Sequence, residues 1–427
     1  AAAQTGANGG PMFQKGFPVP QTHAAPEGII RAEACAPATA LRDLEWNNVR
    51  ALIENAGALW YNRAIDKGAF MVPKEEGVSV VYGGALWMGG ISPDQQLKLA
   101  AVRYRNTGND FWPGPLTNTG GAEVDPATCE QYDKFAISQR ADAMRHRQYF
   151  DCLADPECEM EEQFPTGYSI PTYFFDYPAH GNVSLNQDFY LSPFLDYDGN
   201  GFYDPSAGDY PWYDFLQEID CDERRREDPV PLYGDQTYYW IFNDKGNIHT
   251  ETGADPIGME IRAQAFSFAS NDEVNNMTFY NYEMINRSTQ ELTNTFFAVW
   301  VDSDIGCSED DYVGCDVERG LGYSYNADAV DNDGCNGAQA IGANPPAIGV
   351  DFFEGPYQDN DGLDNDFGIG INEALNGIGY GDGVIDNERF GMRRFLYYSN
   401  TTNGANPNQT DPISSSDYYN YLRGFWK

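Results

Sequence analysis

The chain has 427 residues, of which 65 are acidic and 26 are basic, and its formal net charge is -39. Such an acidic excess repels the phosphates of nucleic acids and the headgroups of anionic lipids, which argues against both as partners. Hydrophobic residues make up 41% of the chain and aromatic residues 14%, so the composition is not that of a disordered acidic tail.

Residues 1–40 are rich in Gly, Pro and Ala and show no periodicity, which predicts an extended arm. The first residues resemble the start of a mature chain after signal-peptide cleavage, and we expect the natural polypeptide to continue beyond Lys427. An arm with exposed apolar side chains is a liability unless a neighbour buries it, which predicts a homo-oligomer or polymer. The alternative is an arm that folds back on its own domain. These side chains are Met12, Phe13, Phe17, Val19, Ile29 and Ile30.

Residues 41–128 read as a first β segment that contains a short helix. Val49, Leu52 and Ile53 recur at helical spacing, which predicts a helix that ends near Gly57. Short β-like runs follow at residues 78–82, 85–88 and 97–104, separated by glycine pairs or turn residues. No run in the chain approaches the roughly 20 apolar residues that a membrane span needs.

Residues 129–235 read as a helical and loop insertion. Ser138 is predicted to cap a helix that runs through Arg140 to Phe150, with Cys152 and Cys158 flanking its end. Residues 161–235 are rich in Pro, Tyr and Asp and predict long ordered loops. Loops of that length need a pin such as a metal ion or a disulfide.

Residues 236–427 contain the clearest strands, predicted at 238–242, 257–268, 277–285 and 295–302. Polar and apolar residues alternate from Met277 to Ile285. Consecutive antiparallel strands with short turns favour a mainly β fold with a β-sandwich or jelly-roll-like core. Weaker strands are predicted at 320–325, 347–353 and 395–399, among Asp/Gly-rich loops.

The segment from Asp196 to Asp204 has the spacing of the front half of an EF-hand-type calcium loop. Oxygen-bearing residues occupy positions 1, 3, 5 and 9, and Gly201 occupies position 6. Position 12 is Ala207, so the closing ligand must come from elsewhere, either Asp209 or Asp214. The alternative is a solvated Asp–Gly turn. The predicted Ca²⁺ ligands are Asp196, Asp198, Asn200, the carbonyl of Phe202, Asp204 and Asp209.

Further acidic loops extend the calcium prediction. One cluster places four carboxylates at close spacing, which would repel one another strongly without a cation. A second, weaker match resembles the back half of a calcium loop. The predicted ligands are Asp359, Asp361, Asp364 and Asp366 in the first, and Asp382 and Asp386 in the second. A third group, Asp302, Asp304, Asp310, Asp311 and Asp316 with Asp331 nearby, is either a calcium-and-disulfide-pinned loop or a solvated acidic face.

The eight cysteines form an even set in an acidic chain, which indicates disulfides and an oxidising compartment. Zinc is the less favoured reading, because there is no C-x-x-C motif and there are only four histidines. The favoured local pairings are Cys307–Cys315 and Cys152–Cys158. Longer links are left for Cys35, Cys129, Cys221 and Cys335.

Catalytic signatures are absent from the sequence: there is no G-x-S-x-G, no H-E-x-x-H and no Walker A motif. His249 and Glu251 could act together as a catalytic general base, but an exposed turn histidine is the favoured interpretation. Trp212-Tyr213 and Tyr238-Tyr239-Trp240 could stack on sugars, although packing in a core or interface is favoured. The sequence therefore predicts a protein that is not an enzyme.

Six stretches carry a family resemblance: residues 47–51, 85–90, 110–116, 196–211, 278–288 and 311–316. They resemble large Bacteroidota extracellular proteins that are exported by type IX secretion. The resemblance spans roughly residues 46–427 and implies export to the cell surface or medium, without catalytic residues to carry over. Such proteins typically carry a C-terminal sorting domain, which this sequence lacks, so we expect a truncated or processed chain.

These features together predict a secreted structural or adhesive subunit of an extracellular surface appendage or coat, stabilised by calcium and disulfides. Its partners are predicted to be further copies of itself and a cell-surface or glycan target. The alternative is a secreted protein that binds polysaccharides or cleaves glycosidic bonds, which needs two facing carboxylates about 5–10 Å apart.

Overall fold

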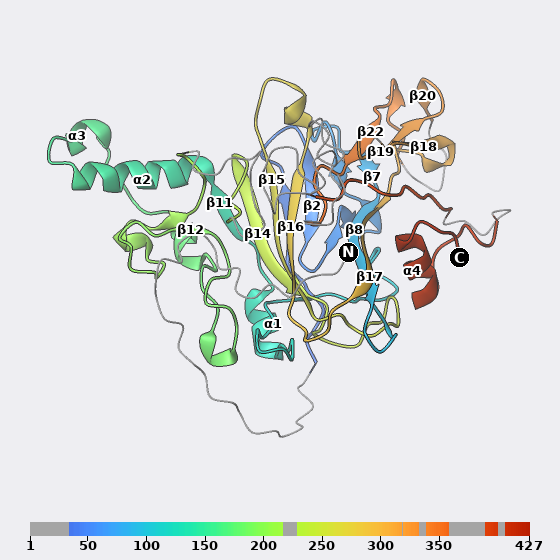
Figure 1. The fold of residues 1–427 in the computed structure, drawn as a ribbon. Coiled ribbons are helices and arrows are strands. Elements are labelled where there is room, and N and C mark those ends of the chain that lie inside the picture. Colours follow the sequence, from blue (N-terminus) through green and yellow to red (C-terminus); the bar gives the residue numbers. More distant parts are fainter. Residues whose placement is uncertain (1–33, 217–228, 318, 333–338, 358–388, 400–405) are drawn as a thin grey trace, which may run out of the picture.

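The computed structural model describes residues 34–216, 229–317, 319–332, 339–357, 389–399 and 406–427. Two antiparallel sheets pack as a β-sandwich, which confirms the predicted mainly β fold (Figure 1). The first sheet has eight strands, in the order β17-β8-β3-β2-β6-β7, with β1 paired to β2 and β9 paired to β8. They are β1 (Leu41–Leu44), β2 (Arg50–Glu54), β3 (Ala58–Leu59), β6 (Phe70–Met71), β7 (Ser79–Val81), β8 (Gly83–Ile91), β9 (Leu97–Ala100) and β17 (Thr293–Asp302).

The second sheet has five strands, in the order β10-β14-β15-β16, with β11 paired to β14. Consecutive pairing of β14, β15 and β16 matches the strands predicted from alternation. The fourth predicted strand, β17, leaves this sheet and pairs with β8 of the first sheet. The strands of the second sheet are β10 (Trp112–Pro113), β11 (Ala136–Gln139), β14 (Gln236–Asn243), β15 (Met259–Ser267) and β16 (Phe279–Asn286).

The main core lies between the two sheets and draws on both halves of the chain. The Trp60 indole donates a hydrogen bond to the Tyr280 hydroxyl at 2.7 Å, which links the turn after β3 to β16. Strand β14 is buried along its whole length. Trp240 and Phe242 belong to the main core, whereas Tyr239 and Ile241 belong to a second core beneath the insertion.

The helix predicted before Gly57 is wrong, because Val49, Leu52 and Ile53 lie in or next to strand β2. Residues 51–54 are all buried, so the strand packs on both faces and lacks the alternation that identifies a half-buried strand. The buried Glu54 carboxylate at its end forms ion pairs with Arg63 and Arg105.

The insertion contains the predicted helix as α2 (Arg140–Ala154), which extends from the side of the sandwich (Figure 1). Its N-cap is Gln139, without a side-chain hydrogen bond; Ser138 is a buried residue of β11, so the predicted cap is wrong. The described residues of the segment 161–235 form mainly loops with short helices and strands, in line with the predicted long ordered loops. The insertion's other elements are α1 (Pro126–Tyr132), α3 (Met160–Gln163), β12 (Phe194–Leu195), β13 (Tyr210–Pro211), and the 3-10 helices η1 (Thr172–Asp176), η2 (Val183–Leu185) and η3 (Pro205–Ala207).

Beyond β17 the chain forms small sheets and returns to the sandwich. A three-stranded sheet contains β18 (Asp311–Asp316), β19 (Leu321–Asn326) and β22 (Ile348–Asp351), and β20 (Val330–Asp331) pairs with β21 (Gly342–Ala343). Residues 395–399 form only an isolated bridge at Ser399, so the strand predicted there is wrong. The last helix, α4 (Ser415–Leu422), packs on the first sheet through Tyr418, whose ring centroid lies 4.8 Å from that of Trp87.

The remaining short elements are β4 (Tyr61–Asn62), paired with β5 (Lys67–Gly68), and the 3-10 helices η4 (Glu273–Asn276) and η5 (Ser308–Asp310). Among the described residues, no helix has the length and apolar character needed to cross a bilayer.

Candidate cation-binding loop at residues 196–209

The Asp196 carboxylate organises the first turn of the loop. Its Oδ1 accepts hydrogen bonds from the backbone N–H groups of Gly199 at 2.9 Å and Asn200 at 3.1 Å, and its Oδ2 accepts one from Gly201 at 2.7 Å. Gly199 and Gly201 have φ values of 74° and 81°, a left-handed conformation that favours glycine. The tight wrap that the sequence spacing predicts is therefore present.

Asp209 closes the loop from outside the predicted ligand positions 1 to 9. Its Oδ1 accepts from the backbone N–H of Tyr197 at 2.8 Å, and its Oδ2 accepts from that of Asp204 at 2.7 Å. Asp196, Asp198 and Asp209 each place one carboxylate oxygen within 4.8 Å of the others. Burial, opposed by the two backbone hydrogen bonds and reinforced by the carboxylates of Asp196 and Asp198, raises the pKa of Asp209 to about 6.

The other predicted ligands of this loop make local contacts. Asp204 accepts from the backbone N–H of Ser206 at 2.8 Å and so caps η3. The Asn200 side chain donates to Asp198 at 2.8 Å and accepts from the Phe202 backbone at 2.7 Å. The structure thus gathers three of the predicted side chains, while Asp359, Asp361, Asp364, Asp366, Asp382 and Asp386 lie outside the described residues.

Two neighbours hold the loop in place. The His180 ring accepts from the backbone N–H of Tyr203 at 2.8 Å through Nε2, so its other nitrogen carries the proton and donates to the Phe189 carbonyl at 3.1 Å. Burial lowers the pKa of His180, which favours this neutral form. From α2, Asp151 accepts a hydrogen bond from the Tyr197 hydroxyl at 3.1 Å.

The buried His146 of α2 lies in the second core beside this loop. Its Nδ1 lies 2.8 Å from the Tyr168 hydroxyl, and its ring contacts Phe174 and Tyr210. Burial, partly opposed by backbone carbonyl groups at residues 205–209, lowers the pKa of His146 to about 4. The ring is therefore neutral at pH 7.

His249 is buried, so its interpretation as an exposed turn residue is wrong. Its Nδ1 lies 2.8 Å from the Leu99 carbonyl and its Nε2 contacts the Asp244 carbonyl. The Asp110 carboxylate lies 3.6 Å from Nδ1, so buried polar groups surround the ring. Glu251 instead forms an ion pair with Arg103 at 2.8 Å, so His249 and Glu251 do not form the catalytic pair considered above.

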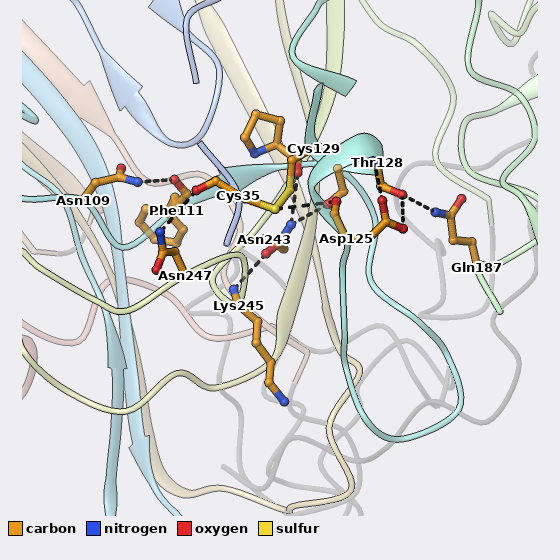
Figure 2. Close-up of a disulfide and its surroundings, with 12 residues drawn as sticks. Cys35, Asn109, Phe111, Asp125, Thr128, Cys129, Gln187, Asn243, Lys245 and Asn247 are labelled. Atoms are coloured by element: carbon orange, nitrogen blue, oxygen red, sulfur yellow. Dashed lines mark hydrogen bonds between the residues drawn. A yellow bond between two sulfur atoms is a disulfide. The ribbon is translucent and has the colours of Figure 1, made fainter. Parts of the chain in front are cut away.

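Two disulfides lie within the described residues. Cys152–Cys158, predicted from the sequence, closes the end of α2 with a Cα–Cα distance of 5.2 Å. Cys35–Cys129 joins the last part of the predicted arm to α1 (Figure 2). Next to this disulfide, the backbone N–H of Cys35 donates to the Gly246 carbonyl at 2.9 Å. This longer link fixes residues 34–40 against the sandwich.

The predicted pair Cys307–Cys315 is wrong. Cys315 is free and exposed, whereas Cys307 is buried and disulfide-bonded. The partner of Cys307 is outside the described residues. The local pairing fails because residues 311–316 form an extended strand, which carries Cys315 away from Cys307 at about 3.3 Å per residue.

The predicted third acidic group, which contains Asp304, Asp310 and Asp311, lies around Cys307. Asp310 and Asp331 place carboxylate oxygens within 4.8 Å of each other and of the Cys307 sulfur. Burial, with the neighbouring Asp310 and Asp331, raises the pKa of Asp311 to about 6. Burial and two carboxylates raise that of Asp304 to about 7. This region is therefore partly buried, unlike a merely solvated acidic face.

The aromatic residues considered for sugar stacking are buried. Trp212 and Tyr213 belong to the packed interior of the insertion, and Trp240 lies in the main core, as the favoured interpretation held. Sequence reasoning missed a different set, Tyr312, Tyr323 and Tyr325, which are exposed on one face of the small sheet. Their alternation along β19 was the available signal.

Comparison with known proteins gives no assignment: no protein-family model, no curated protein and no solved structure matches this chain.

Proposed function

We propose that this chain is a secreted structural or adhesive subunit of an extracellular surface appendage or coat, stabilised by calcium and exported by type IX secretion. The observation that carries the calcium part is the approach of three carboxylates, Asp196, Asp198 and Asp209, within 4.8 Å. Like charges this close destabilise the fold unless they are protonated or bind a cation. Calcium prefers such oxygen ligands, and the glycine-rich wrap is typical of its loops.

A structural role is supported by what the histidines of the described part of the chain do. His146, His180 and His249 each bind neighbouring groups inside the fold, and each has a packing or hydrogen-bonding role there. Two disulfides fix the end of α2 and residues 34–40 at the end of the arm. Both features suit a protein that persists outside the cell, where disulfides are stable.

The test of calcium binding is the melting temperature in calcium and in excess chelator. A cation that binds only the native state stabilises it by about 2.7 kcal/mol at a hundredfold excess over its Kd. We expect chelator to lower the melting temperature of the wild type, and this difference to shrink in the variant D196N/D198N.

The matched control is D255N, which removes an exposed carboxylate that pairs with Lys98 at 3.2 Å. It should keep the full calcium response. Equal melting curves for the wild type in calcium and chelator would reject the calcium part of the proposal.

Assembly is the second part of this proposal, and it concerns the arm formed by residues 1–40. Light scattering in calcium, on the whole chain and on a chain without residues 1–33, distinguishes assembly through the arm from a monomer. We expect the whole chain to form larger particles than the shortened one. A monomer of unchanged mass in both cases would contradict assembly through the arm.

Polysaccharide binding is a second candidate, favoured by the exposed tyrosines of the small sheet. Tyr312 is 57% exposed and Tyr325 is 43% exposed, and their ring centroids lie 5.9 Å apart. Exposed aromatic faces of this kind stack on sugar rings. A glycan array with the wild type and Y312A/Y325A tests binding, and a reducing-sugar assay tests cleavage; an array without signal would remove this candidate.

A further inference from the structure

A second group of oxygen ligands lies where the chain leaves β17, far along the sequence from the 196–209 loop. Asp310 is the last residue of η5, Asp311 begins β18, and Asp331 ends β20. Oxygens of Asp310 and Asp331 lie within 4.8 Å of each other. Two different elements therefore bring their carboxylates together, and Asp311 directly follows Asp310 in the chain.

Three buried oxygen atoms in this group have no hydrogen-bond partner among the described residues. They are the Oδ1 atoms of Asp310, Asp311 and Asn326. Asn326 stands directly opposite Asp311 in the β18–β19 ladder, so the two side chains share one face of the sheet. Buried acceptors without donors cost free energy, which a bound cation would offset.

Asn326 distinguishes this group from a simple cluster of acids. Its side chain is an uncharged amide in a residue that is only 8% exposed. Its Nδ2 donates to the Asp328 carbonyl at 3.2 Å, which fixes the orientation of the amide and leaves Oδ1 directed away from that bond. The amide therefore lies beside the Asp311 side chain, and amide oxygens are typical calcium ligands.

The remaining carboxylate oxygens are held by the backbone. Asp311 accepts from the backbone N–H of Ile305 at 2.8 Å, and Asp331 accepts from those of Cys307 at 3.1 Å and Ile341. These bonds orient the side chains before any ion arrives. The nearby Cys307 sulfur is in a disulfide and supplies no thiolate, so the group selects a hard cation.

We propose that Asp310, Asp311, Asp331 and the amide oxygen of Asn326 bind a calcium ion that joins the β18–β19 hairpin to the loop after β17. Calcium takes six to eight oxygens, so backbone carbonyl groups or water complete its shell. This site shares no residue with the 196–209 loop, and each site is testable without the other.

The test is a calorimetric titration of chelator-stripped whole chain with calcium chloride. We expect D310N/D311N to bind one calcium ion fewer than the wild type, and D196N/D198N to lose one independently. The control D255N should bind as many ions as the wild type. If D310N/D311N binds as many as the wild type, the inference is overturned, whatever D196N/D198N shows.

Asn326→Leu provides a second test in case the double variant D310N/D311N does not fold. It removes the amide oxygen while leaving the carboxylates in place. We expect it to weaken the affinity for one of the bound calcium ions by at least about tenfold. Its near-ultraviolet circular dichroism spectrum should match that of the wild type. Unchanged affinity of every equivalent in folded Asn326→Leu would overturn the inference.

Discussion

The sandwich and the loops around it are stabilised by different means. In the sandwich, apolar side chains from residues 41–102 and 236–302 fill one core, with Ile53, Phe242 and Ile261 fully buried. The 196–209 and 302–331 regions instead gather clusters of carboxylates at the edges of the packed parts of the molecule. Packing of apolar side chains therefore dominates the stability of the core, whereas the stability of the loops should depend on cations.

The largest expected effect is on the core. Trp240→Ala removes a side chain that is 1% exposed and packs against Phe135 with ring centroids 5.3 Å apart. We expect a loss of about 3–5 kcal/mol in the free energy of unfolding, the usual cost of such a cavity. Urea titrations should give the same loss in calcium and in chelator; a loss that depends on calcium would contradict the separation of core and loops.

A smaller effect concerns pH and the insertion. Because the pKa of His146 is about 4 in the folded chain and 6.5 when exposed, the neutral ring is favoured by folding. Its contribution is complete above pH 6.5 and is lost as the pH falls towards 4. A shift of this size corresponds to roughly 3 kcal/mol.

The comparison of the wild type with H146Q between pH 7 and pH 4 isolates this contribution. The glutamine variant keeps a polar partner for Tyr168 but does not titrate. Urea titrations should show a steeper loss of stability with acid in the wild type. Parallel pH profiles would show that His146 is not buried as a neutral ring.

The disulfide at the end of α2 should have the smallest effect. Cys152 and Cys158 are six residues apart, and closing so short a loop contributes roughly 2 kcal/mol in the chain-entropy account. We expect C152S/C158S to lower the melting temperature modestly and to increase amide exchange at residues 148–158. Equal exchange at α2 with and without the disulfide would show that the helix end is fixed by other contacts.

The sequence predicted the elements whose signals are local. The alternation from Met277 to Ile285 identified β16, and the spacing of Asp196, Asp198 and Gly201 identified a wrapped loop that the structure shows. Strand β2 was missed because burial on both faces removes alternation. Strand β17 joins the other sheet because it pairs with β8, which lies about two hundred residues earlier in the chain. No local sequence pattern predicts such a pairing.

Long-range neighbours also decided the remaining errors. His249 reads as a polar turn residue, but Leu99 and Asp110 surround it from another part of the chain. Cys307 and Cys315 are close in sequence, which predicts a local disulfide, but the extended strand β18 separates them in space. Asn326 gave no signal of its own, because its role depends on its position opposite Asp311 in the ladder.

Hydrogen exchange by mass spectrometry, in calcium and in excess chelator, tests the central claim most directly. The account predicts that calcium slows exchange in peptides that cover residues 196–209 and 302–331. Exchange in strands β14, β15 and β16 should be the same in both conditions. Equal exchange of both loop regions with and without calcium, or a change confined to the sandwich strands, would contradict the account.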